Sequence, residues 1–418
     1  MDRIKIGKAL LGELNNYGYQ AYLVGGTVRD YLLGLESYDI DIATSARPEE
    51  VMKLWPEAIP TGIKYGTVTV IYEGQAVEVT TFREESDYHD FRRPESVNFG
   101  DSLAADVARR DFTINALAMD YSGNVIDYYA GREALASRVI KTVGSPEERF
   151  REDPLRMLRA IRFVAQLGFE IEASTWEQLL VQAPYIQYVA LERIKKELDR
   201  LLVAKHTSQA VAPLYESGLF KWIAHFKETK IEQLDVSLIS RLMHETTDVI
   251  ARWYLLLFQL TDDDFNHLIV SFPLTKKEQG ALYQYRSVQQ ILAEELSENT
   301  LKGCLLSFDE EIIAEMIKLI QLLNTPETSK DYEETVQYRL TQLKQLSNSL
   351  PAKSIKDLAI DGNNLIAELN LSPGKQIGEL MEELLRRVVF AGLANEKNAL
   401  LREAAKIRGE MIEQLSDS

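Results

Sequence analysis

The chain has 418 residues, and 64 acidic against 47 basic side chains give it a formal net charge of −17 at pH 7. A composition that is 45% hydrophobic and 27% charged is typical of globular proteins, so it excludes a fibrous repeat or a wholly disordered chain. The acidic balance does not exclude a nucleic-acid partner, because net charge governs long-range attraction and leaves the placement of local basic patches open. At roughly 150 residues per domain, the length predicts two to four units.

The sequence carries no signal for a membrane or an oxidising compartment. No apolar run approaches the roughly 18 residues that a membrane-spanning helix requires, and the first residues lack the apolar stretch of a signal peptide. A single cysteine, Cys304, allows no intrachain disulfide. One cysteine and five scattered histidines leave no evident ligand set for a structural zinc site. We therefore expect a cytoplasmic protein without a membrane partner.

Turn residues and β-branched runs alternate through residues 1–146. The pattern predicts helices over 6–17 and 112–119, and strands over 67–72 and 77–80. Strands and helices that alternate in this way indicate a mixed α/β arrangement in this part of the chain.

From residue 147 onward the sequence pattern is almost entirely helical. Apolar residues recur three and four apart between 155 and 167, and prolines interrupt the later helices at intervals. Strand signals almost vanish, and no fixed-period repeat is present. We therefore predict an α+β protein, with a mixed sheet in its N-terminal part and an all-α remainder.

An Asp-x-Asp pair, Asp39 and Asp41, lies in an extended segment with Ile40 and Ile42. Side chains alternate faces along a strand, so both carboxylates point the same way. Two like charges this close repel each other, and Mg²⁺ bound through one or two carboxylates plus substrate phosphates removes the conflict. The pair thus predicts magnesium-assisted phosphoryl or nucleotidyl transfer, with both aspartates as catalytic metal ligands. A solvated strand face is the alternative, and the role of Glu78 as a third carboxylate stays open.

Gly25-Gly26 lies between an apolar strand and a helix that begins near Thr27. Backbone amides at such a turn can face an anion, because glycine places no side chain in the way. Arg29, one turn into the helix, can add a charge-assisted hydrogen bond to a phosphate oxygen. No Gly-Lys-Ser/Thr follows, which excludes a P-loop. Gly26 and Arg29 are therefore candidate nucleotide-binding residues.

Together these residues resemble the nucleotidyltransferase head of class II CCA-adding enzymes and bacterial poly(A) polymerases. Residues 109–116, Arg-Arg-Asp-Phe-Thr-Ile-Asn-Ala, resemble the family's second motif, which implies that Arg110 binds the nucleotide. Residues 152–163, which begin Glu-Asp-Pro-Leu-Arg, resemble its Glu-Asp-x-x-Arg motif, and residues 191–198 resemble the helix-stabilising motif that follows. Residues 374–397 look like the family's tRNA-facing tail.

The third head motif departs from the family pattern, because Asp127-Tyr128-Tyr129-Ala130-Gly131 stands in place of Asp-Pro-Phe-x-Gly. Asp127 and Gly131 are kept, so we expect only a local difference in this loop. The resemblance implies a polymerase β-like fold for the nucleotidyltransferase head. It also implies four domains: a catalytic head at 1–146, a helical neck at 147–208, a helical body at 209–350 and a helical, tRNA-binding tail at 351–418.

The Glu-Asp-x-x-Arg segment also has a chemical interpretation. Asp153 and Arg156 are three residues apart, which predicts neighbours on one helix face. An aspartate accepts from an exocyclic amine and an arginine donates to ring nitrogens and carbonyls, so one pair serves cytosine and adenine alike. Uracil and guanine present a carbonyl instead of the amine, and a buried mismatch costs roughly 1–3 kcal/mol or more. Arg159 and Arg162 continue this face and are expected to hold the triphosphate, although a solvated face of Glu/Arg pairs is the alternative.

The polar segment 83–94 is predicted to be a mobile loop. It is similar to the family's flexible loop that permits the switch from C to A addition and that CC-only relatives lack. The resemblance therefore implies addition of C, C and A to the 3′ end of tRNA from CTP and ATP, with Mg²⁺ as cofactor and pyrophosphate as product. A homodimer is a further, open expectation.

Three alternatives stay open. Two of them use the same chemistry: an A-adding enzyme acting on CC-ended tRNA, and a poly(A) polymerase. The third comes from another class and is a non-catalytic RNA-binding protein.

Overall fold

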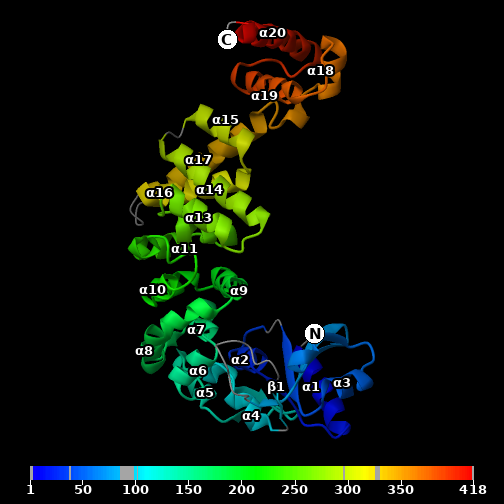
Figure 1. The fold of residues 1–418 in the computed structure, drawn as a ribbon, viewed down its shortest axis with the longest axis vertical. Helices are drawn as coiled ribbons and strands as arrows, with labels where there is room; N and C mark the ends of the chain where they lie inside the picture. Colours follow the sequence, from blue (N-terminus) through cyan, green and yellow to red (C-terminus); the bar gives the residue numbers. More distant parts are fainter. Residues whose placement is uncertain are drawn as a thin grey trace. The chain divides into compact units, whose positions relative to one another are not determined.

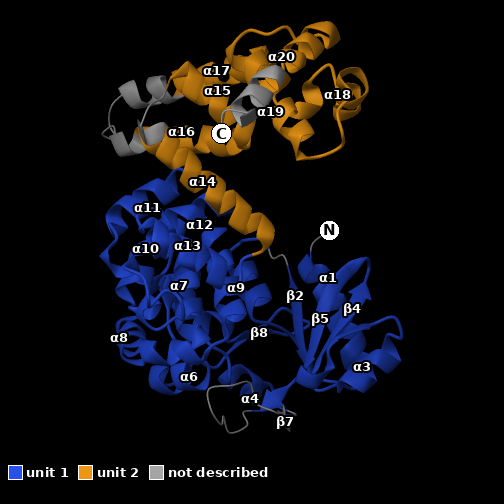
Figure 2. Cartoon of the chain, turned by 45° about the horizontal axis from the view of Figure 1, so that its top comes forward, with its two compact units in different colours: residues 1–274 blue, residues 275–418 orange. Residues whose placement is uncertain are grey.

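The computed structural model describes residues 3–36, 39–84, 98–100, 102–294, 297–324 and 330–416. The chain divides into two compact units, residues 1–274 and 275–418 (Figure 2). The predicted loop at 83–94 lies outside the described residues apart from Arg83 and Glu84. These two residues form strand β6 (Arg83–Glu84), which pairs antiparallel with β7 (Asn98–Phe99).

In the described part of the first unit, one mixed sheet has the strand order β3-β4-β5-β2-β1-β8-β9. Strand β1 of this sheet is labelled in Figure 1, in the blue N-terminal part of the chain. Strands β2 and β5 pair in parallel, and the other neighbouring strands pair antiparallel. The strands span Ala21–Val24 (β1), Ile40–Thr44 (β2), Ile59–Gly62 (β3), Thr67–Tyr72 (β4), Gln75–Thr81 (β5), Leu117–Met119 (β8) and Val125–Asp127 (β9).

Helices cover this sheet because its central strands bury apolar side chains. Helix α1 (Arg3–Asn16) packs against β1 and β2 through residues that include the fully buried Leu10, Leu11 and Leu14. Helix α2 (Gly26–Leu32) begins two residues after β1 and packs against β1, β2 and β8. Three further helices complete this part of the unit: α3 (Pro48–Leu54), α4 (Leu103–Ala108) and α5 (Gly131–Ser137).

The rest of the first unit is helical apart from a short parallel pair, β10 (Val139–Ile140) with β11 (Glu170–Ile171). Helix α7 (Leu155–Leu167) packs against α9 and α10, with Leu158 and Ile161 fully buried. The other helices here are α6 (Pro146–Glu152), α8 (Ala173–Gln182), α9 (Leu191–Leu202), α10 (Thr207–Glu216), α11 (Val236–His244), α12 (Val249–Leu257) and α13 (Asp262–Ser271).

The second unit is helical throughout its described residues. Its helices are α14 (Lys276–Glu294), α15 (Glu298–Ser307), α16 (Glu310–Asn324), α17 (Lys330–Ser349), α18 (Gly362–Leu369), α19 (Lys375–Phe390) and α20 (Lys397–Ser416). A hydrophobic cluster joins α18, α19 and α20 around Leu365, Leu384 and Leu400, which are fully buried.

The predicted fold class, a mixed sheet followed by helices, is confirmed. The helix predicted over 112–119 is wrong, because this segment forms the 3₁₀ turn η2 (Thr113–Asn115) and strand β8. Every residue from 116 to 119 is fully buried, and a short run that is apolar on all sides fits a helix and a doubly covered strand equally well. The four-domain division is finer than the two observed units and stays a prediction.

None of the helices within the described ranges is both long and apolar enough to cross a membrane.

The carbonyl groups at and just after the C-terminal end of α9 accept from a buried arginine and from the Thr207 hydroxyl. Arg252 in α12 is 5% exposed and donates to the carbonyl oxygens of Leu202 at 2.5 Å and Ala204 at 3.0 Å. It also donates to the carbonyl oxygen of Thr246 at 2.8 Å. The last carbonyls of a helix have no partner within the helix, so this side chain supplies donors that the backbone lacks.

We predict that Arg252→Met lowers the free energy of unfolding by roughly 2–4 kcal/mol, since the Leu202 and Thr246 carbonyls lose their short hydrogen bonds while Ala204 keeps that from Thr207, and each buried carbonyl without a good donor costs about 1–3 kcal/mol. Denaturant midpoints at unchanged slope measure the difference. Arg151→Met is the matched control: this side chain is 55% exposed, and its loss should change the free energy by no more than about 0.5 kcal/mol. Equal effects of the two substitutions would contradict the assignment.

Candidate active site

A cavity of about 800 Å³ opens in the first unit between the central strands of the sheet and helices α7 and α9. Its walls come from the turn after β1, from β2 and β5, from the segment after α4, and from the two helices. Every residue that the sequence singled out as catalytic or nucleotide-binding lines it: Gly26, Arg29, Asp39, Asp41, Arg110, Asp153, Arg156, Arg159 and Arg162.

The turn after β1 brings the backbone close to an arginine. Gly25 has φ +65° and ψ −132°, a conformation that favours glycine, and its amide donates to the Leu117 carbonyl at 3.2 Å. A Cβ on Gly25 would lie 2.7 Å from Nη1 of Arg110 and 4.0 Å from Oδ2 of Asp41. Any side chain here would displace the arginine, so Gly25 permits the close approach of backbone, guanidinium and carboxylate.

Thr27 of α2 fixes the acidic segment. Its hydroxyl donates to the Asp39 carbonyl at 3.2 Å and accepts from the Asp41 amide at 2.9 Å. Asp39 is exposed and directly precedes β2, whereas Asp41 lies within that strand. One hydroxyl therefore holds both aspartates at the start of α2, where the glycine turn also lies.

Glu78 joins these acids from the neighbouring strand. It is the register partner of Asp41 in the parallel pairing of β5 with β2 and lines the same cavity. Burial, and after it repulsion from Glu78, raise the pKa of Asp41 to about 6, although the Arg110 guanidinium acts in the opposite direction. Oxygen ligands of this kind suit a divalent cation such as Mg²⁺, and the excess negative charge favours one. The acidic group therefore fits a metal held by carboxylates.

Arg110 is oriented by an acid that the sequence analysis did not single out. Asp106 in α4 is 1% exposed and accepts from Nη2 of Arg110 at 3.1 Å. It also pairs with Arg109 and accepts from the Arg83 amide at 3.3 Å. Although burial disfavours a charged carboxylate, the two arginines hold the pKa of Asp106 below its usual value. A charged Asp106 thus fixes Arg110 at the edge of the cavity.

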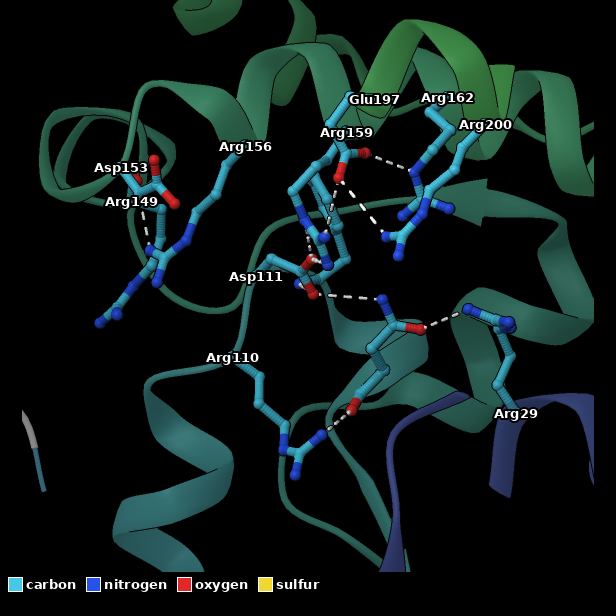
Figure 3. A network of polar contacts seen from close by, with 12 residues as sticks. Arg29, Arg110, Asp111, Arg149, Asp153, Arg156, Arg159, Arg162, Glu197 and Arg200 are labelled. Carbon is cyan, nitrogen blue, oxygen red and sulfur yellow. Dashed lines mark hydrogen bonds and ion pairs between the residues drawn. The ribbon is translucent and has the colours of Figure 1, made fainter. Parts of the chain in front are cut away.

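A network of hydrogen bonds and ion pairs joins the sheet side of the cavity to α7 and α9 (Figure 3). Asp111 accepts from Nε of Arg159 at 2.9 Å and from Nδ2 of Asn115 at 3.1 Å. Asn115 in turn accepts from Nη1 of Arg29 at 2.7 Å. These contacts connect α2, η2 and α7, which are far apart in the sequence.

Glu197 on α9 binds two arginines of α7, Arg159 and Arg162. It is 4% exposed and accepts from Nε of Arg162 at 2.6 Å and from Nη1 of Arg159 at 3.5 Å. Burial lowers the pKa of Arg162 to about 10, and the neighbouring Glu197 opposes the shift. Arg159 and Arg162 therefore face the cavity from one side of α7, as their spacing predicted, and both have acidic partners.

Asp153 and Arg156 do not share a continuous helix, which corrects the sequence analysis. Asp153 has φ −143° and ψ 97°, so the chain is extended between the end of α6 and the start of α7. The cause lies in the next residue, because Pro154 disfavours the helical conformation of the residue before it. Both side chains still line the cavity, where each is held by hydrogen bonds to its own partners.

Those contacts come from four surrounding residues. Asp153 accepts from Nη2 of Arg193 in α9 at 2.8 Å. Arg156 is 8% exposed and donates to the Glu152 carboxylate at 2.6 Å and to the carbonyl oxygens of Arg149 at 3.2 Å and Arg109 at 3.0 Å.

In the third head motif, Asp127 and Gly131 hold the loop that leads into α5, and the expectation of only a local difference stays a prediction. Asp127 accepts from the backbone amides of Tyr129 at 3.2 Å, Gly131 at 2.8 Å and Arg132 at 2.9 Å, so it caps the start of α5. A Cβ on Gly131 would lie 2.3 Å from the Thr113 carbonyl oxygen, which leaves no room for a side chain. Tyr128 is 54% exposed. Asp127 and Gly131 therefore hold the loop between β9 and α5 in place.

Several residues of the site were not predicted to act there: Thr27, Asp106, Asp111, Asn115, Arg193 and Glu197. Asp111 and Asn115 lie within the motif at 109–116, but nothing local reveals that their partners are on α2 and α7. Arg193 and Glu197 lie in the motif at 191–198, and their spacing places both on one helix face. That spacing was the available signal.

We predict that Asp111→Asn destabilises the protein at neutral pH by roughly 1–3 kcal/mol, because it removes charge-assisted hydrogen bonds between a buried acid and the partly buried Arg159. Although burial opposes it, the Arg159 guanidinium holds the pKa of Asp111 well below its usual value. A depressed carboxyl pKa adds stability that is full above the unfolded value of about 4 and is lost as the pH falls through the folded value.

The gap between wild type and Asp111→Asn should therefore shrink as the pH is lowered below about 4. Denaturant titrations at a series of pH values measure it. Glu147→Gln, at an acid whose side chain is 50% exposed, serves as the control and should show little difference at any pH. A gap that is independent of pH would contradict the ionised pair.

Three family models match the chain. Residues 21–141 match the model described as Poly A polymerase head domain. Residues 168–229 match the probable RNA and SrmB-binding site of polymerase A, and residues 244–404 match a putative domain 2 of tRNA nucleotidyltransferase.

Full-length relatives and a solved structure agree with these models. A CCA-adding enzyme of Ligilactobacillus salivarius is 35% identical over 98% of this chain and 98% of its own length, and one of a Geobacillus species is 37% identical over 96% and 97%. The crystal structure of the Bacillus stearothermophilus CCA-adding enzyme in complex with CTP aligns over 97% of this chain and 98% of that one, with a TM-score of 0.78 and 32% identity. The chain belongs to the family of CCA-adding enzymes.

Proposed function

We propose that this protein adds C, C and A to the 3′ end of tRNA, using CTP and ATP and releasing pyrophosphate. The observation that carries the proposal is a cavity lined on one side by the acids Asp39, Asp41 and Glu78 and on another by the arginines of α7. A nucleoside triphosphate presents its phosphates to both features at once, and the full-length relatives described above are named CCA-adding enzymes.

Asp39 and Asp41 are the residues that would hold Mg²⁺, with Glu78 beside them on β5. When bound there, the metal supplies electrostatic stabilisation of the phosphoryl oxygens and activates the attacking hydroxyl. The protein's part is to place the acids: Thr27 binds the backbone at both aspartates, which fixes them next to the phosphate-facing turn. The 3′-oxygen of the tRNA forms a bond to the α-phosphorus, and the bond to pyrophosphate breaks.

The triphosphate and ribose would contact the residues around the turn. Gly26 offers backbone amides, and Arg29 and Arg110 supply guanidinium groups on either side of it. Arg159 and Arg162 face the cavity from α7, but Asp111 and Glu197 occupy part of their donor sets. Nucleotide phosphates would therefore compete with these carboxylates for the arginines.

Asp153 and Arg156 would select the base. Asp153 accepts the exocyclic amine that cytosine and adenine share, and Arg156 donates to a ring nitrogen or carbonyl. Both terminal nitrogens of Arg156 donate to protein acceptors in this structure, so base recognition requires the side chain to exchange one of these partners. Uracil and guanine would place a carbonyl opposite Asp153 and be rejected.

The remaining expectations follow from the same proposal. The segment 351–418 would bind tRNA through its backbone phosphates, and the enzyme would act in the cytoplasm where tRNA is matured. A homodimer stays an open prediction. The A-adding enzyme, the poly(A) polymerase and the non-catalytic RNA-binding protein differ from the proposal in which RNA they extend, or in extending none.

Asp39→Asn and Asp41→Asn are expected to lower kcat by about 10³-fold each, because a catalytic metal contributes several kcal/mol and each 1.36 kcal/mol is tenfold. Incorporation of labelled nucleotides into tRNA lacking CCA, CC-ended tRNA and unstructured RNA measures the loss and separates the alternatives. Glu49→Gln, at an exposed acid of α3, is the control and should keep full activity. Undiminished incorporation by either aspartate variant would refute the metal role.

Asp153→Asn should weaken base selection rather than chemistry. Its amide can donate to the carbonyl of uracil, so the ratio of kcat/KM for CTP over UTP should fall by about 10–100-fold, as a mismatch of 1–3 kcal/mol implies. Steady-state rates with each nucleotide on tRNA lacking CCA give the ratio. Glu147→Gln on α6 is the control. An unchanged CTP-to-UTP ratio in Asp153→Asn would argue against a base contact.

A further inference from the structure

A second group of potential metal ligands lies away from the cavity, in the helical part of the first unit. His225, Glu228 and His267 each offer one ligand atom, and these three atoms all lie within 4.8 Å of one another. Nε2 of His267 is 3.0 Å from Oε2 of Glu228. Within the part of the chain that the structure describes, no other set of histidine, cysteine or acidic side chains meets this spacing. None of the three residues lines the cavity of the candidate active site.

We propose that His225, Glu228 and His267 form a binding site for a divalent transition-metal ion of the zinc class. Two imidazole nitrogens and one carboxylate oxygen are a zinc ligand set, and such a set leaves one position for water. Imidazole favours Zn²⁺ over Mg²⁺ or Ca²⁺, which prefer oxygen ligands. The site is therefore chemically distinct from the acidic group at Asp39 and Asp41.

The turn that carries two of the ligands is held rigidly. His225 and Glu228 lie between the 3₁₀ turns η4 (Leu219–Lys221) and η5 (Ile231–Gln233). Between them, Phe226 is 1% exposed and stacks on Phe220 with ring centroids 4.8 Å apart. It also meets Phe272, just after α13, edge to face at 5.2 Å. A buried aromatic ring thus fixes the turn against the end of the helix that carries His267.

The geometry of His225 adds a second observation. Its backbone is left-handed, with φ +69°, a conformation that is uncommon for a residue other than glycine. Its Nδ1 atom is buried and has no hydrogen-bond partner among the described residues. The ring meets that of His267 at a centroid distance of 5.5 Å and an interplanar angle of 60°. The His225 ring therefore lies beside the ring of His267, and no hydrogen bond from the described residues occupies its Nδ1 atom.

Metal binding requires only small movements of the side chains. Ligand atoms around a tetrahedral zinc lie about 3.3 Å apart, given bonds of about 2.0–2.1 Å. The observed spread of up to 4.8 Å is closed by rotations of His267 and Glu228, whose side chains are 41% and 53% exposed. An ion held here would cross-link the turn after η4 to α13 and stabilise the folded unit.

Titration of Zn²⁺ into the full-length protein in the presence of excess Mg²⁺, which occupies the acidic group, tests the proposal. Calorimetry should show one zinc per chain, and zinc should raise the unfolding temperature because only the folded state holds the complete site. Loss of a direct ligand exceeds the roughly tenfold effect of outer ligand partners. His225→Ala and His267→Ala should therefore each weaken binding by more than tenfold and abolish the temperature shift.

Two controls separate this site from others. His244→Ala removes an exposed histidine at the end of α11, and Asp41→Asn removes an acid of the cavity; both variants should keep zinc binding. Co²⁺ bound in place of zinc should give visible absorption in the wild type that is absent from His267→Ala, and circular dichroism of the metal-free variants shows whether they fold. No saturable uptake by the wild type, or uptake that both histidine variants retain, would overturn the proposal.

Discussion

The ion pair between the buried Asp111 and the partly buried Arg159 is the interaction on which the arrangement of the cavity depends. Asp111 comes from the segment after α4 and Arg159 from the middle of α7, so the pair joins the sheet-bearing part of the first unit to its helices. Burying two charges is costly unless hydrogen bonds satisfy them. Asn115 supplies one to Asp111, and Glu197 supplies a second carboxylate to Arg159. The satisfied pair fixes the rotation and register of α7 relative to the strands that carry the acidic group.

This arrangement explains how an acidic chain can present a cationic surface to phosphates. Each cavity-facing arginine of α7 has a carboxylate partner: Glu152 for Arg156, Asp111 for Arg159 and Glu197 for Arg162. The partners orient the guanidinium groups before a nucleotide arrives, which lowers the cost of ordering them on binding. Net charge therefore says little about the ligand, because the local sign is set by which side chains face the cavity.

Local patterns in the sequence predicted the parts of the site that depend on one segment. Alternation along a strand placed Asp41 on the cavity side, and helical spacing placed Arg159 and Arg162 on one face of α7. Asp153 was misplaced on that helix although Pro154 carried the signal that the helix is broken there.

Contacts between distant segments could not be read in this way. Arg193 meets Asp153 across 40 residues, and Arg159 meets Asp111 across 48. The proposed zinc ligands belong to the same class, because histidines scattered along the chain gave no spacing from which their proximity could be inferred. The mixed sheet and the helices were predicted correctly where periodicity was clear, and the segment 112–119 was not, because its apolar run has no polar side that marks a period.

These contacts make helix α9 a support for the cavity, a role that its own sequence pattern does not indicate. Through Arg193 it binds one carboxylate oxygen of Asp153, whose other oxygen accepts from the Leu155 amide at the start of α7, and through Glu197 it binds Arg162 and Arg159. The two groups of residues proposed to meet the base and the phosphates thus share one support. A shift of α9 along α7 would move the acceptor for the exocyclic amine and release the arginines together. The proposed base and phosphate contacts would therefore be coupled through this helix.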